Sequence, residues 1–396
     1  MEIKKSFRHT KTACYIAGMV QAMVCGFVPL LVVIFNRDYG ISLSLITVLL
    51  TVNFVAQFTA DLVSIFFVNK VSRRACIVAA HIFVGTGYFL LGVVPFFMKD
   101  IYWGVFLSVV LFSTGGGLLE VMTSPILDSC PSENKAAAMS ILHSMFSFGS
   151  IGVILLSSIF FWVFGQANWQ YLPFIWSIIA LLNAVYLSIV PIEKTNAENE
   201  KISVRGVFKQ KQFFVFMLVM MCGGASEIAM SQWASAFAES SLGVSKTVGD
   251  ILGPCMFALM MGISRITYPV FAHKINLMKY IKVCSALCVA AYLIAALSPF
   301  KAFALAGCGL CGFAVGIMWP GTVSLAARSS LNGGTAIFAL IALAGDIGCT
   351  VGPMVVGFVS SIFGGEFRTG LLAATIFPLI LFIGMSILNN KKSSSD

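Results

Sequence analysis

Long apolar stretches, separated by short polar loops, follow one another along the whole chain. A helix needs about 20 mainly apolar residues to cross roughly 30 Å of hydrocarbon. Stretches of this kind predict helices over residues 12–35, 43–68, 76–98, 102–127, 137–163, 170–191, 212–238, 249–272, 280–298, 302–327, 335–361 and 369–388. The pattern therefore predicts an all-α membrane protein with twelve transmembrane helices.

The longest polar interruption is EKTNAENEKISVRGVFKQK, which follows the sixth predicted helix. It divides the chain into an N-terminal six-helix half, residues 1–191, and a C-terminal six-helix half with a short tail, residues 212–396. The residues between them, 192–211, are expected to form a charged cytoplasmic linker.

The two halves repeat each other weakly. Gly117 and Pro125 in the fourth predicted helix have the same separation as Gly312 and Pro320 in the tenth. Parallel six-helix repeats, with a binding site between them near the membrane midplane, are typical of one class of secondary transporters. The repeat therefore favours a carrier built from two related halves.

Composition and charge agree with a membrane location. Hydrophobic residues make up 59% of the chain and charged residues 10%, whereas about a quarter of a soluble domain is charged. Loops on the predicted inner side hold 19 Lys and Arg residues and outer loops hold 5. By the positive-inside rule, both termini are cytoplasmic, and the net charge of +9 needs no nucleic-acid partner. The first apolar run is too long for a cleavable signal peptide, so we expect a multi-pass protein of the cell membrane.

The sequence predicts no cofactor, no metal site and no enzymatic activity. Most of the 11 cysteines fall within predicted helices. Cys308-x-x-Cys311 has no matching ligands in its Gly-rich helix, so we interpret it as packing. The chain contains no GxxxxGK[ST] loop for ATP phosphates.

The loop after the second predicted helix reads NKVSRR. It resembles the D-R-x-G-R-[RK] loop of major facilitator superfamily transporters, with Asn69 in place of the acid. The basic residues Lys70, Arg73 and Arg74 are retained. In that family the loop locks the cytoplasmic side of the carrier, so the resemblance implies a gating role for these three residues.

Two further stretches carry the resemblance. Gly348-x-x-x-Gly352-Pro353 is similar to the Gly-Pro motif of inner helices in the superfamily. GGGLLEVMTSPILDS resembles the fourth helix of the fucose permease branch of sugar–proton symporters, where a glutamate stands five residues before a proline, as Glu120 and Pro125 do. The resemblance implies that Glu120 belongs to a substrate and proton site. The aspartate that this branch places in the first helix has no equivalent in QAMVCGFVP.

Carboxylates inside the predicted helices point to the same kind of site. A charge at mid-bilayer costs about 2.5–3.5 kcal/mol on insertion scales, so it is retained where it faces a cavity or a partner. Glu120, Ser124 and Asp128 share one helix face. We interpret this face as a cavity wall; a structural carboxylate is the alternative.

The second predicted helix has a similar polar face, made by Asn53, Gln57, Asp61 and Ser64. Its period of about one turn predicts a second cavity wall. Asp61 also lies near the NKVSRR loop, so the sequence leaves open a structural pairing with an arginine of that loop.

In the seventh predicted helix, Glu227 and Ser231 share a face, with Gln232 and Trp233 adjacent. A carboxylate, an amide and an indole suit a polar solute with an apolar face, such as a sugar ring. A packing face of small residues is the alternative reading.

Three further residues are candidates inside the membrane. Asp346, flanked by glycines, is predicted to pair with Arg265, although Arg265 could instead reach the membrane surface. His143 lies on a serine-rich face of the fifth predicted helix, where it is either a proton relay or a structural histidine.

These patterns predict a secondary active transporter that moves a small polar solute, a sugar or related metabolite, by alternating access coupled to protons. A carboxylate in a low-dielectric cavity holds a proton more firmly than in water. Glu120 is the first candidate for the proton carrier and Glu227 the second. We expect a monomer in the lipid bilayer. A proton-coupled drug or metabolite exporter is the main alternative, and a non-transporting receptor or scaffold is another.

Overall fold

The computed structural model describes residues 6–67, 71–131, 135–192, 210–271, 276–327 and 335–393. Within these ranges the chain is helical, and no β-strand occurs. Twelve of the described helical segments are long and apolar enough to cross a membrane, which confirms the predicted fold class. The chain forms two compact units, Met1–Glu198 and Asn199–Asp396. The division falls within the predicted linker, of which residues 193–209 lie outside the described part.

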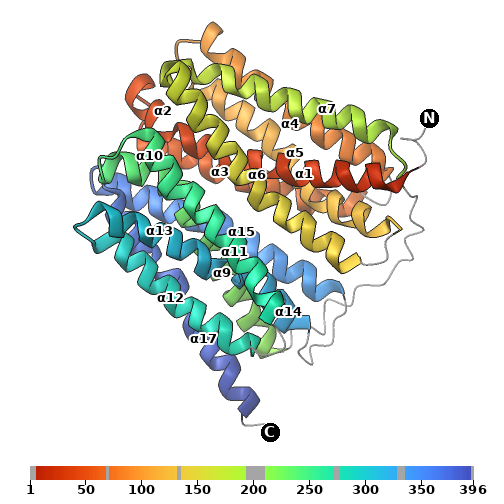
Figure 1. Cartoon of the computed structure of the whole chain (residues 1–396), viewed down its shortest axis with the longest axis vertical. Coiled ribbons are helices and arrows are strands. Elements are labelled where there is room, and N and C mark those ends of the chain that lie inside the picture. The colour runs from red at the N-terminus through yellow and green to blue at the C-terminus, as the bar shows by residue number, and fades with distance from the viewer. Residues whose placement is uncertain are drawn as a thin grey trace. The chain divides into compact units, whose positions relative to one another are not determined.

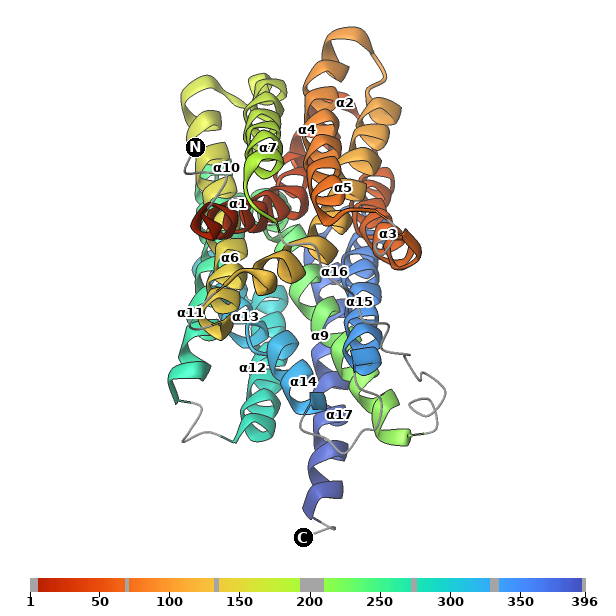
Figure 2. The ribbon, with the colours of Figure 1, turned by 90° about the vertical axis from the view of Figure 1, so that its right-hand side faces the viewer.

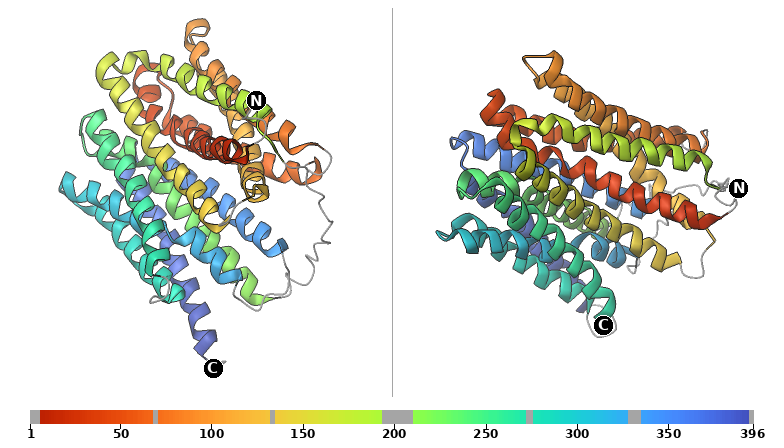
Figure 3. Two further views of the ribbon diagram at one scale, coloured as in Figure 1. Left: turned by 45° about the vertical axis from the view of Figure 1, so that its right-hand side comes forward. Right: turned by 45° about the horizontal axis from the view of Figure 1, so that its top comes forward.

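In the N-terminal unit, helices far apart in sequence lie side by side (Figures 1 and 3). Its main pairs are α4 with α5 and α7, α1 with α6, and α3 with α5. The elements are α1 (Phe7–Gly26), η1 (Val28–Leu31), α2 (Val32–Tyr39), α3 (Leu43–Phe67), α4 (Arg73–Phe97), α5 (Tyr102–Ser129), α6 (Lys135–Phe164), η2 (Gln166–Tyr171) and α7 (Leu172–Ile189).

The first span is broken, although the sequence pattern predicted one helix over 12–35. The α-helix ends at Gly26, and a 3-10 turn, η1, leads into α2. Pro29 lies in this turn. Proline has no N–H, so Pro29 makes no helical hydrogen bond to the carbonyl four residues before it, that of Cys25. The carbonyl of Met23 accepts the N–H of Phe27 and also a side-chain donor. Tyr88 donates to the carbonyl of Met23, with an O···O distance of 2.6 Å.

Three consecutive glycines let α5 pack closely against its neighbours. A Cβ atom at Gly115 would overlap the backbone of α4 at Ala80, and one at Gly117 would overlap the backbone of α3 at Gln57. A Cβ at Gly116 would press on α1. Small residues of this kind allow membrane helices to approach at backbone distance. The glycines thus fix the position of the polar face that follows them.

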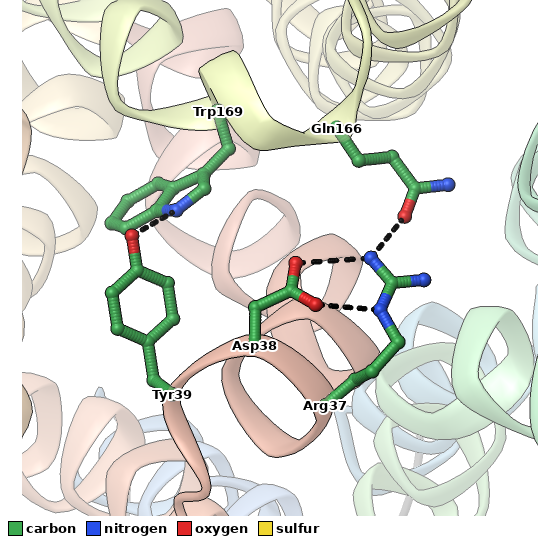
Figure 4. Close-up of polar contacts among 5 residues, drawn as sticks. All are labelled: Arg37, Asp38, Tyr39, Gln166 and Trp169. Carbon is green, nitrogen blue, oxygen red and sulfur yellow. Dashed lines mark hydrogen bonds and ion pairs between the residues drawn. The ribbon is translucent and has the colours of Figure 1, made fainter.

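The end of the N-terminal unit away from the N-terminus is tied together by polar contacts between α2 and η2 (Figure 4). Arg37 contacts Asp38 through two hydrogen bonds of 2.6 and 3.0 Å and also donates to Gln166 at 3.1 Å. The indole N–H of Trp169 donates to the hydroxyl of Tyr39 at 3.1 Å. These contacts brace the broken first span against the start of the sixth.

In the C-terminal unit the main pairs are α9 with α15 and α17, and α13 with α11 and α12. The end of α17 extends beyond the neighbouring helices of its unit (Figure 2). The elements are α9 (Lys211–Ala236), η3 (Phe237–Ser241), α10 (Lys246–Asp250), η4 (Ile251–Cys255), α11 (Met256–Phe271), α12 (Leu277–Leu297), α13 (Lys301–Val315), α14 (Met318–Ala327), α15 (Thr335–Ile362), α16 (Phe367–Ala374) and α17 (Ile376–Ser393).

Glycines also set the contact between α9 and α15. A Cβ at Gly348 would overlap the backbone of α9 at Met221, and one at Gly352 would overlap it at Ala225. Gly348, two residues after Asp346, therefore admits the backbone of a neighbouring helix.

Two more spans depart from a regular α-helix. The eighth span contains the π-helical turn η4, which includes Pro254. The tenth is interrupted between α13 and α14, at Gly316 and Ile317. Discontinuous membrane helices expose backbone polar groups, and in transporters they are found at binding sites.

Candidate functional site

A chain of side-chain amides connects α1, α3 and α5 in the N-terminal unit. Asn53 donates its Nδ2 to the carbonyl of Val24 at 3.1 Å. Its Oδ1 accepts from the Ser113 hydroxyl at 2.6 Å and from Gln57 Nε2 at 3.0 Å. Gln57 Oε1 in turn accepts from Gln21 Nε2 at 2.8 Å. Asn53 and Gln57 are buried, so these bonds satisfy polar groups that are out of contact with water.

Glu120 lies at the end of this amide chain. Gln21 Nε2 is 3.5 Å from Glu120 Oε2. The preceding residues of α5 are buried, whereas Glu120 and Asp128 are exposed and Ser124 is half-buried. The predicted polar face of α5 is therefore the more open face of this part of the helix.

Asp61 lies one turn beyond Gln57 on α3 and is half-buried. Its Oδ1 would be 3.0 Å from a Cβ atom at Gly117, so the carboxylate lies against the glycine run of α5. The carboxylate of Asp61 thus lies near the stretch of α5 that carries Glu120. The amides of α3 and α1 lie near the same stretch. A site with this composition offers both hydrogen-bond donors and acceptors to a ligand.

The two arginines of the NKVSRR loop reach backbone carbonyls. Arg73 Nη1 is 3.5 Å from the carbonyl of Pro125 on α5. Arg74 donates to the carbonyls of Leu187 and Ser188, at 3.0 and 2.6 Å, at the end of α7. A cation at this position satisfies free carbonyls and is favoured by the helix dipole. Lys70 lies outside the described residues, and the gating role of the loop stays a prediction.

In the C-terminal unit, Glu227 of α9 is close to Arg265 of α11. Their Oε1 and Nη2 atoms are 3.4 Å apart, and Glu227 is 8% exposed. The sequence predicted Arg265 as a partner of Asp346; that pairing stays a prediction, with Asp346 half-buried on α15. The contact with Glu227 adds a partner that the pattern had not indicated.

The residues after Glu227 differ in their surroundings. Ser231 is half-buried, and Gln232 is buried. Trp233 is fully buried, and its indole N–H donates to the carbonyl of Pro353 at 2.9 Å. The structure therefore gives Trp233 a packing contact between α9 and α15, and its role toward a solute stays a prediction.

Two histidines, His81 and His143, fall within the predicted membrane helices. His81 is fully buried, with Nδ1 2.8 Å from the carbonyl of Ile77 and Nε2 2.8 Å from the amide nitrogen of Asn183. Asn183 donates to Nε2, so Nδ1 carries the proton and the ring is a neutral structural group. The side chain of His143 lies outside the described part, and its relay role stays a prediction.

The sequence analysis missed two groups of residues. Gln21 was passed over because it is a single amide in an apolar run. Lys246 was assigned to an outer loop, yet its Nζ lies 2.7 Å from Asp250 Oδ1 and 2.7 Å from the Ser235 hydroxyl, which itself donates to Asp250. Both charged side chains are at most 4% exposed. Their spacing of four residues is the signal that could have indicated a pair.

Cysteine geometry gives no metal centre in the described ranges, where no cluster of three or more His, Cys, Asp or Glu side chains could hold an ion. Cys311 faces Cys288 of α12, with the sulfur atoms 3.8 Å apart. The Cys308-x-x-Cys311 stretch thus contributes to helix packing.

Comparison with known proteins decides the family. Residues 14–339 match the family model for the Major Facilitator Superfamily. The chain belongs to the Major Facilitator Superfamily. It is therefore a multi-pass membrane transporter of small solutes. None of the curated protein sequences compared with this transporter matches it.

Solved structures share the fold at low sequence identity. A bacterial homologue of the human lysosomal transporter Spinster has a TM-score of 0.78 at 15% identity, covering 98% of this chain and 97% of that one. For the Escherichia coli fucose:proton symporter the TM-score is 0.65 at 15% identity, with 96% and 98% covered. For a D-xylose–proton symporter it is 0.76 at 13% identity, with 96% and 97% covered.

Proposed function

We propose that this transporter moves a small polar solute, a sugar or related metabolite, across the cell membrane together with protons. The observation that carries the proposal is the amide chain that ends at Glu120. Gln21 places its amide beside the exposed carboxylate of Glu120, and hydroxyl groups of a sugar can donate to such a carboxylate. Two of the structurally similar proteins are sugar–proton symporters by name, which supports the same direction.

Glu120 is the proposed proton carrier. It is exposed on α5 and has one amide contact, so it is accessible to protons and to a solute. Proton binding is coupled to transport if the protonated and ionised forms favour different states of the carrier. We propose that these states arise by rocking of the two halves, as in other carriers with repeated halves. Glu227 is the second candidate, since Arg265 already compensates its charge.

The distribution of Lys and Arg supports cytoplasmic termini. We also propose that the protein acts as a monomer, with each half contributing its own helices.

Solute-driven proton movement tests this function. The purified protein would be placed in liposomes with a pH-sensitive dye outside, and sugars, amino acids and lipophilic cations would be added in turn. Alkalinisation of the bath on adding one sugar, absent from protein-free liposomes, supports sugar–proton symport. Proton release into the bath on adding lipophilic cations alone identifies an antiporter instead. Silence with every solute contradicts the proposed substrate class.

A further inference from the structure

The amide chain between α1 and α3 has a fixed direction. The carbonyl of Val24 is only an acceptor, so Asn53 must present its Nδ2 to it, at 3.1 Å. Asn53 Oδ1 then faces inward and accepts from Ser113 and Gln57. Reversing the Asn53 amide would place donors against donors at Gln57. The backbone of α1 therefore sets the orientation of the side chains that follow.

This direction extends to Gln21. Gln57 uses its Nε2 for Asn53, so its Oε1 must accept, and it does so from Gln21 Nε2 at 2.8 Å. Gln21 Nε2 also faces Glu120 Oε2 at 3.5 Å. The other end of the amide, Gln21 Oε1, is buried and has no hydrogen-bond partner among the residues that the structure describes. A buried acceptor without a donor is unfavourable, so this oxygen lacks one donor.

We propose that protonated Glu120 supplies that donor and forms a two-bond pair with the amide of Gln21. An ionised carboxylate only accepts, whereas a protonated carboxyl has one O–H to donate. In the pair, Gln21 Nε2 donates to one carboxyl oxygen of Glu120, and the Glu120 O–H donates to Gln21 Oε1. The contact of 3.5 Å is one half of this arrangement. Gln21 is then a positioning residue through which proton binding at Glu120 is transmitted to α1 and α3.

The amide of Gln21 lies beside the glycine run of α5. A Cβ atom at Gly116 would lie 3.2 Å from Gln21 Oε1 and 3.3 Å from Gln57 Oε1, so the glycine lies directly beside both amide oxygens. The amide of Gln21 cannot simply turn over to present its oxygen to Glu120, because its Nε2 would leave the acceptor on Gln57. To form the pair, the carboxyl group of Glu120 therefore has to move toward Gln21, because the Gln21 amide stays hydrogen-bonded to Gln57.

Other ionisable groups lie near Glu120 on the elements packed against it. Asp61 of α3 adjoins the glycine run, and Cys25 of α1 has its sulfur 3.9 Å from Gln57 Oε1. Arg73 of α4 reaches α5 at Pro125, and Asp128 lies two turns further along α5. On α6 the side chain of His143 is outside the described part. None of these changes the number of bonds that the Gln21 amide can make.

The inference rests on the proposed function in its use of Glu120 as the proton carrier, and infrared spectroscopy tests it without a solute. The carboxylic C=O band of protonated Glu120 would be recorded in liposomes and assigned by its loss in Glu120→Gln. In Gln21→Met we expect the band at higher frequency, because the carboxyl loses both hydrogen bonds. Gln170→Met is the matched control, because Gln170 of η2 also has a buried Oε1 without a partner in the described structure. In this variant the Glu120 band should keep its frequency.

The possible results separate the inference from the proposed function. An unmoved band in Gln21→Met, or an equal shift in Gln170→Met, overturns the pair. A complete absence of a Glu120 band at every pH where the protein stays folded overturns both the pair and the proton role of Glu120. A shifted band without any solute-driven proton movement supports the pair and contradicts the proposed function alone.

Discussion

The guanidinium of Arg265 on α11 lies 3.4 Å from a carboxylate oxygen of Glu227 on α9. The side chains are 19% and 11% exposed, respectively, so water screens the pair only in part. A charge in an apolar helix is retained when it has a partner, and each residue supplies one for the other. The contact joins α9 to α11 at the level of the candidate residues of the C-terminal unit.

Breaking this pair from one side should destabilise the protein. Glu227→Ala removes a charge-assisted hydrogen bond and leaves Arg265 partly uncompensated, which we expect to lower the free energy of unfolding by roughly 1.5–3 kcal/mol. The double variant Glu227→Ala/Arg265→Met should recover much of the loss, because no charge remains. Thermal unfolding in detergent measures both. A loss in Asp346→Asn with no loss in Glu227→Ala would instead favour Asp346 as the main partner.

Glu120→Gln tests the proposed proton carrier directly. Glutamine keeps the size and hydrogen-bonding capacity of the side chain but cannot bind and release a proton. We expect accumulation driven by a pH gradient to be lost, while exchange of solute across the membrane continues. The effect of pH on solute affinity, about 5- to 150-fold for a coupling free energy of ordinary size, should disappear. Uptake and counterflow in proteoliposomes distinguish these activities, and gradient-driven uptake that survives would contradict the assignment.

The spans could be predicted because each is an apolar run of sufficient length, and this signal is local. The breaks could not be placed in the same way. Pro29 and Pro254 both lie inside apolar runs, and whether a proline bends a membrane helix or interrupts it depends on which neighbouring groups satisfy the freed carbonyls. Near the end of α1, the carbonyls of Val24 and Met23 accept from Asn53 and Tyr88, which come from other helices.

The residues of the candidate site could be predicted only in part, for a similar reason. The face of Asn53, Gln57 and Asp61 follows from helical spacing within one helix. Its partner Gln21 is an isolated amide on another helix, and no periodicity marks it. Trp233 is close to Glu227 in sequence and on the same helix, but its indole donates to the carbonyl of Pro353 on another helix. Which helix faces which depends on tertiary packing, and the local pattern does not contain it.

The close contact of α15 with α9 gives a further prediction. A Cβ at Gly348 would overlap the backbone at Met221, which cannot move aside as a flexible side chain can. We expect Gly348→Ala to lower stability by about 1–3 kcal/mol, the usual cost of overpacking. Gly152→Ala on α6 is the control, because a Cβ there meets nothing within 4 Å. It should be neutral or raise stability by up to about 1 kcal/mol, since alanine favours a helix over glycine. Equal unfolding temperatures for the two variants would contradict the packing argument.

The buried pair of Lys246 and Asp250 should be more sensitive than any exposed charge. The two side chains are 4% and 0% exposed, so the loss of one leaves the other with little water to compensate it. We expect Asp250→Ala to cost about 3–5 kcal/mol, the usual result of breaking a buried pair from one side. Replacing both residues by apolar ones, Lys246→Met with Asp250→Leu, should restore most of this stability, because the desolvated charges are removed together.

Thermal unfolding of the single and double variants in detergent measures the difference, with Lys301→Met as the control for an exposed lysine of the same unit. If the double variant is as unstable as Asp250→Ala, Ser235 must depend on the ionic pair for its own hydrogen bonds. The hydroxyl of Ser235 both donates to Asp250 and accepts from Lys246. A triple variant that also carries Ser235→Ala should then regain stability, because no buried polar group is left without a partner.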